Sequence, residues 1–194
     1  MQWRRVVLTL AAGAVGCAVN LLPVTVFGPV KVVFGSVLSL LIAIVYGPVY
    51  GLAAALIAST STVRLWGHGY GVLTFGLEAL VVGWLVAHRR QSPLWAELRF
   101  WAFPGLPLLI WIYLIHFDYP SPNGLAIVVK EPLNGLLAVM LAELLAWVGP
   151  VQRLLLGPEE ATARRPLRAY LYHAFLLLAT LPVALLAIVN GRAY

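Results

Sequence analysis

The stretch from Ser59 to Glu78 carries the side chains best suited to chemistry. It reads STSTVRLWGHGYGVLTFGLE and lies between two long apolar runs. It holds the ionisable residues Arg64, His68 and Glu78 together with four glycines. Ionisable groups beside lipid are costly and mark functional sites by default. Glycine-rich, irregular backbone at membrane depth is tolerated only where protein or a water-filled cavity supplies its hydrogen bonds. We therefore expect the surrounding helices to enclose a polar pocket at this stretch.

A second group of polar side chains lies further along the chain. Lys130 and Asn134 are four residues apart, so they project from one face of a helix, and Pro132 between them removes a backbone donor and kinks that helix. Lys130 either lines the pocket or snorkels to the outer interface, and the two alternatives stay open. The predicted ligand-binding residues are Arg64, Trp66, His68, Tyr70, Glu78, Lys130 and Asn134.

Glu78 needs a partner or a proton. A lone carboxylate in the apolar middle of a membrane helix costs on the order of 3 kcal/mol by insertion scales. Arg64 and His68 are its candidate partners nearby in sequence, and Lys130 is a distant one.

No catalytic signature accompanies these residues. His68 and Glu78 can form an acid–base pair, but the chain contains no H-E-x-x-H, no G-x-S-x-G and no Cys/His ligand set. His116 and Asp118 are two possible metal ligands two residues apart, which is a weak signal. We therefore expect no catalytic residues, no metal and no other cofactor.

The composition is that of an integral membrane protein. The 194 residues are 62% hydrophobic and 10% charged, with a mean hydropathy of +0.92, whereas about 25% of residues are charged in soluble domains. Several apolar runs reach the roughly 20 residues that a membrane-spanning helix needs. The net charge of +6 does not indicate a nucleic-acid partner, because nine of the thirteen basic residues form three clusters that flank apolar runs.

The expected fold is all-α, a polytopic bundle of about seven helices. The expected helices cover residues 6–22, 30–46, 49–58, 72–87, 101–115, 124–147 and 170–189. A Gly-rich re-entrant or broken segment is expected near residues 60–71, and SPLWAELR at residues 92–99 is expected at the membrane interface. In this division residues 1–150 form a six-helix core, 151–169 a basic cytoplasmic loop, and 170–194 an additional span.

The basic residues predict the orientation of this bundle. With a cytoplasmic N-terminus, seven spans place nine arginines inside and leave the C-terminus and the polar stretch outside, in accord with the positive-inside rule. The pocket should then open outward. Ala14 and Ala18 lie on one face of the first helix and either dock a partner protein or pack within the bundle.

The region from residue 27 to 147 resembles the N-terminal multi-helix membrane sensor regions of bacterial signalling proteins. The resemblance rests on Gly35-Ser36, Trp66-Gly67-His68, Glu78, and Lys130 with Asn134-Gly135. It implies a sensory input module of the bacterial inner membrane that binds a small solute and passes the signal to attached histidine-kinase or diguanylate-cyclase domains. It also implies a homodimer formed through those domains. No kinase, cyclase or PAS sequence is present in these 194 residues.

A second, broader resemblance concerns architecture. VFGPVKVVFGSVLSLLIAIVYGPVYGLAAAL is similar to patterns in the substrate-binding S components of energy-coupling-factor vitamin transporters. It implies a six-helix fold in which small residues of helix 1, here Ala14 and Ala18, dock the energising subunit. The alternative function is therefore solute capture for transport. A stand-alone product of six helices would favour transport, and a seventh helix counts against it.

Overall fold

A computed structural model describes residues 2–27, 30–119 and 121–157. The described residues are helical apart from short connections and one antiparallel pair of strands, β1 (Val24–Phe27) and β2 (Val30–Val32). The helices are α1 (Gln2–Asn20), α2 (Ser36–Tyr46), α3 (Pro48–Trp66), α4 (Tyr70–Arg89), α5 (Pro93–Phe100), η1 (Trp101–Gly105), α6 (Leu106–Ile110), η2 (Trp111–His116), α7 (Ser121–Trp147) and α8 (Gly149–Leu156). The all-α prediction is thus confirmed except for the strand pair.

Three helical segments are long and apolar enough to cross a membrane. They are Tyr70–Arg89, the continuous run Pro93–His116 formed by α5 to η2, and Gly124–Trp147 within α7. They correspond to the helices expected at 72–87, 101–115 and 124–147. The expected helix at 170–189, and residues 158–169 of the expected loop, lie outside the described residues.

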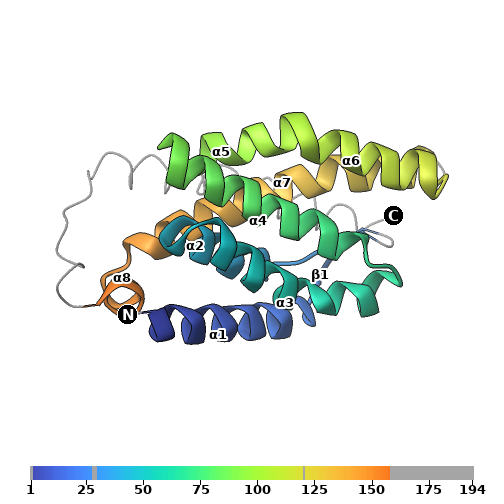
Figure 1. The fold of residues 1–194 in the computed structure, drawn as a ribbon. Helices are drawn as coiled ribbons and strands as arrows, with labels where there is room; N and C mark the ends of the chain where they lie inside the picture. The colour runs from blue at the N-terminus through green and yellow to red at the C-terminus, as the bar shows by residue number, and fades with distance from the viewer. Residues whose placement is uncertain (1, 28–29, 120, 158–194) are drawn as a thin grey trace.

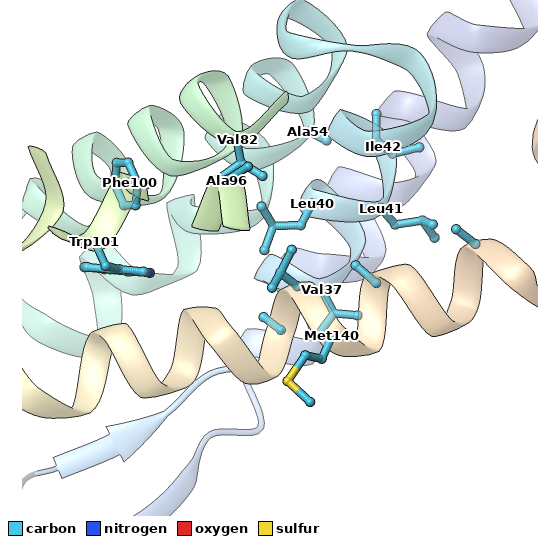
Figure 2. Packing of buried hydrophobic residues seen from close by; sticks show 14 of the residues in the cluster. Val37, Leu40, Leu41, Ile42, Ala54, Val82, Ala96, Phe100, Trp101 and Met140 are labelled. Atoms are coloured by element: carbon cyan, nitrogen blue, oxygen red, sulfur yellow. The ribbon is translucent and has the colours of Figure 1, made fainter. Parts of the chain in front are cut away.

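The helices form a bundle with α1 on one side and the α5–η2 helix on the other (Figure 1). α1 packs against α3 and α2, whereas α5 packs against α4 and α7. α2 is the central element, since it contacts α1, α3, α4 and α7. Its Leu40 and Ile42 are buried in the main apolar core, to which Val82 of α4 and Phe100 of α5 also belong (Figure 2).

Residues 30–35 differ from the prediction, which began a helix near Val30. They form β2 and a short connection, and α2 begins only at Ser36. The β-branched residues of both segments, 24–27 and 30–32, favour strands over helix. Two amides hold the connection in place: Gly35 N–H donates to Asn20 Oδ1 (2.6 Å), and Asn134 Nδ2 donates to the Val33 carbonyl (3.0 Å).

The predicted break near residues 60–71 is also corrected. α3 continues through the hydroxyl-rich stretch to Trp66, and only residues 67–69 separate it from α4. The hydroxyls of residues 59–62 donate to carbonyls three or four residues earlier, at 2.6 to 2.9 Å. Because these groups are satisfied within the helix, they neither require a cavity nor interrupt the helix. Gly67, at φ 75°, ends the helix in a left-handed conformation.

The chain after α7 forms a short helix where an aqueous loop was expected to start. α8 packs back beside the N-terminus, as Figure 1 shows. The Arg4 guanidinium donates to the carbonyls of Arg153 (2.8 Å) and Leu154 (2.7 Å), and the Tyr46 hydroxyl donates to the carbonyl of Leu155 (2.7 Å). Side chains of α1 and α2 therefore satisfy the open carbonyls at the end of α8.

Candidate functional site

The deepest part of the site is a carboxyl pair on α4 and α5. Glu78 is 1% exposed and Glu97 is fully buried. The two carboxyl groups lie within hydrogen-bonding reach of each other. The Trp101 indole N–H, one turn after Glu97, donates to Glu97 Oε1 at 2.6 Å. The partner of Glu78 is thus Glu97 rather than Arg64, His68 or Lys130, the three predicted candidates.

Gly135 of α7 allows this approach. A Cβ at that position would clash with Trp101 Nε1, Glu97 Oε1 and Glu78 Oε1, the last at 2.6 Å. Any larger residue would therefore displace α7 from the two carboxyl groups. The glycine that follows Asn134 in the sequence has a specific packing role.

An ion pair on α7 lies beside the carboxyl pair. Lys130 Nζ contacts Glu131 Oε1 at 2.6 Å, and both side chains are largely buried. Glu131 interacts electrostatically with Glu78 and with Tyr113 of η2. Lys130 also lies 5.4 Å above the ring of Trp66, within the range of a cation–π interaction. Lys130 is therefore directed toward Glu131 and Trp66 at this end of the bundle.

Asn134 is buried on the same face of α7 as Glu131 and Gly135. Its Nδ2 donates to the Val33 carbonyl, which ties α7 to the segment before α2. Its Oδ1 is buried and has no hydrogen-bond partner among the described residues. Asn134 therefore combines a structural bond with an acceptor that is open to a ligand or a water molecule.

Aromatic rings surround His68 at the end of the bundle where α3 and α4 meet. Its ring centroid lies 5.0 Å from Phe117, 5.7 Å from Tyr70 and 5.9 Å from Tyr113. Trp66 is 6.2 Å away. Burial lowers the pKa of His68 from its ordinary value, and a backbone hydrogen bond partly opposes this shift. The ring is consequently favoured in its neutral form, with one buried nitrogen, Nδ1, without a partner among the described residues.

The structure brings most of the predicted site residues into two adjoining groups. Trp66, His68, Tyr70 and Lys130 share the aromatic end, whereas Glu78 and Asn134 lie among the buried polar groups. Glu131 connects the two, since it contacts Lys130 and acts on both Glu78 and Tyr113. Arg64 is exposed and takes part in none of the site contacts described above.

The predicted site left out Glu97 and Glu131, and it left out Trp101 and Tyr113 because aromatic rings at such positions are more often lipid-facing anchors. Glu97 was placed in an interfacial segment because SPLWAELR is amphipathic, but residues 93–116 form one continuous helix that buries it. The spacing of Glu97 and Trp101, four apart on one helical face, is the signal that identifies this pair. Glu131 lies next to Lys130, which was predicted as a site residue. The interaction of Glu131 with Glu78 could be recognised only from the position of α4.

The other candidate residues occupy separate places. His116 stacks on Trp111 with ring centroids 5.3 Å apart, and Asp118 is exposed. Within the part of the chain that the structure describes, no group of three His, Cys, Asp or Glu residues is arranged to hold a metal ion. Ala14 and Ala18 are exposed on α1, while Gly13 and Gly16 face α3 and its neighbours.

Comparison of the chain with protein-family models, with curated proteins and with solved structures gave no match.

Proposed function

We propose that this chain is a non-catalytic sensory input module of a membrane that binds a small solute between α3, α4, η2 and α7. The observation that carries the proposal is the convergence of Trp66, His68 and Lys130 at one end of the bundle, next to buried polar atoms without partners. A small-molecule site combines apolar and aromatic walls with a few placed polar groups. Rings at this site supply stacking surfaces, and Lys130 and His68 supply polar contacts.

Signal transmission follows from the course of α7. The helix carries Lys130, Glu131 and Asn134 near the aromatic end, and it continues to α8 at the opposite end. Pro132 lies between these polar residues and removes one backbone hydrogen bond of the helix. A solute that contacts Lys130 in only one of two helix arrangements shifts the population toward that arrangement. The position of α8 then depends on whether the solute site is occupied, and a shift of α8 transmits the signal to the residues that follow it.

The experiment is a stability screen of the purified chain in lipid nanodiscs against a panel of small polar and aromatic solutes. A bound solute raises the unfolding temperature in proportion to its saturation. We expect His68→Ala and Lys130→Met to abolish the solute-dependent shift and Glu78→Gln to weaken it, with insertion intact. Arg64→Gln is the matched control, because Arg64 is polar and exposed at the end of α3. A shift that survives both His68→Ala and Lys130→Met contradicts the assignment of the site.

Solute capture for transport is the second candidate function. The exposed face of α1 with Ala14 and Ala18 favours it, because small residues allow close approach of another helix. In this case Ala14→Leu with Ala18→Leu prevents co-purification with an energising subunit and leaves solute binding unchanged. For a sensor, the same double variant leaves signalling intact. Fusing the chain to a reporter kinase domain and measuring solute-dependent phosphorylation tests the first function directly.

A further inference from the structure

Several polar atoms in the middle of the bundle are buried without a hydrogen-bond partner among the described residues. They lie on four helices that pack on one another, and they are Ser36 Oγ, Glu78 Oε1, Glu97 Oε2, Glu131 Oε2 and Asn134 Oδ1. Two of them belong to neutral side chains, Ser36 and Asn134, each at least nine-tenths buried. Buried polar atoms are nearly always satisfied, so such a group indicates a bound species, such as water or an ion, that the protein atoms do not supply.

The packing around Gly135 limits which bound species can lie beside the carboxyl groups of Glu78 and Glu97. Glu78 Oε1, Glu97 Oε1 and Trp101 Nε1 converge so closely on Gly135 that not even a methyl group fits there. No group of the described residues is arranged to hold a metal. Two ionised carboxylates cannot hydrogen-bond to each other, because each is only an acceptor. One proton between them removes the repulsion and supplies the missing donor.

We propose that Glu78 and Glu97 together form a proton-binding site in the interior of the bundle, which holds one proton in the folded protein. A proton taken from water forms an O–H bond on one carboxyl group, and that group donates to the carboxylate of the other. The charge of the pair changes from −2 to −1. The Trp101 N–H stabilises the remaining charge on Glu97.

The charged groups that face the pair are few. Of the described residues, Glu97 and Glu131 act electrostatically on Glu78. Glu131 is compensated by its ion pair with Lys130. α2 and α3 pack against α4 but bring no carboxylate, lysine or arginine to Glu78, because Arg64 lies exposed at the end of α3 and α2 contains neither acidic nor basic residues. The proton is therefore the compensating charge for the pair. This inference does not depend on solute binding.

The experiment combines infrared spectroscopy and stability measurements on the full chain in detergent micelles. We expect the parent at neutral pH to show the carbonyl stretching band of a protonated, water-excluded carboxyl group. Glu78→Gln and Glu97→Gln each remove this band, because the amide N–H of the new glutamine donates to the remaining carboxylate in place of the shared proton. Glu143→Gln is the matched control, since Glu143 is a buried glutamate of α7 that does not act on Glu78. Its band is expected to match that of the parent.

Proton linkage gives a second readout. The unfolded chain carries both carboxylates ionised above pH about 5, so the folded state binds one more proton. The unfolding equilibrium constant of the parent should then rise about tenfold per pH unit while the folded pair keeps its proton. Glu78→Gln removes this slope, and Glu97→Gln does the same. If either variant fails to fold, the parent alone tests whether the pair holds a proton: its carbonyl stretching band should be present at neutral pH and be lost at high pH. A parent without the band, or a slope retained in Glu78→Gln, overturns the proposal.

Discussion

Replacing Gly135 by alanine tests the packing at the carboxyl pair most directly. The new methyl group would overlap Trp101 Nε1, Glu97 Oε1 and Glu78 Oε1, all of which are buried. Overpacking of this kind costs about 1 to 3 kcal/mol. Separation of Trp101 from Glu97 forfeits a short hydrogen bond to a charged group, about 1.5 to 3 kcal/mol.

The opposing effect is the better helix propensity of alanine. It returns about 1 kcal/mol relative to glycine. The sum of the three contributions predicts that Gly135→Ala lowers the free energy of unfolding by about 1.5 to 5 kcal/mol. The assay is reversible denaturation in mixed detergent micelles, followed by tryptophan fluorescence, which also reports the environment of Trp101.

Gly76→Ala is the matched control, because Gly76 is also a glycine within a helix. A Cβ there meets only the ends of two flexible leucine side chains, Leu52 and Leu56, at 3.3 Å. We expect this variant to be as stable as the parent or more stable. If Gly135→Ala also equals the parent in stability and in tryptophan emission, the described contact between α7 and the carboxyl pair is wrong.

Three further predictions concern other parts of the bundle. Asn20→Ala leaves the Gly35 N–H and an α3 carbonyl buried without their partner, so the free energy of unfolding should fall by about 2 to 6 kcal/mol; an unchanged denaturation midpoint contradicts this. Because burial lowers the pKa of His68, the contribution of His68 to stability should be full above the ordinary pKa of about 6.5 and be lost as pH falls through the lowered pKa. A His68→Phe variant should lack that decline. Arg4→Gln should speed hydrogen exchange in α8, whereas the exposed Arg90→Gln should not.

The sequence was sufficient to predict the membrane-type composition and the longest apolar helices. Their apolar runs are bounded by charged or helix-breaking residues, so the expected range 72–87 falls within α4 and 124–147 falls within α7. Lys130 and Asn134 were correctly placed on one helix, and burial of Glu78 followed from the cost of an isolated carboxylate in lipid. These are properties of single segments, and local patterns determine them.

The prediction failed where tertiary contacts decide the outcome. The hydroxyl-rich residues 59–62 suggested irregular backbone, but they satisfy their own hydroxyls along α3. Glu97 was assigned to the interface because SPLWAELR is amphipathic, whereas its burial depends on contacts with Trp101 and on the close approach of α7 at Gly135. The connection between β2 and α2 is bonded in turn by side-chain amides that come from α1 and α7. The partners of Gly35 and Val33 lie far away in the sequence, so no local pattern identifies them.

The helix from residue 93 to 116 has a consequence for the relative rotation of its two halves. It contains two π-helical stretches, η1 and η2, and a π turn holds more residues than an α turn. Side chains beyond η1 are therefore turned about the helix axis compared with an uninterrupted α-helix. This rotation contributes to the different directions of Glu97, which faces Glu78, and Tyr113, which faces His68. A one-residue deletion in η1 would shorten the segment by a single residue and keep its apolar character, yet it would rotate every ring beyond it about the helix axis.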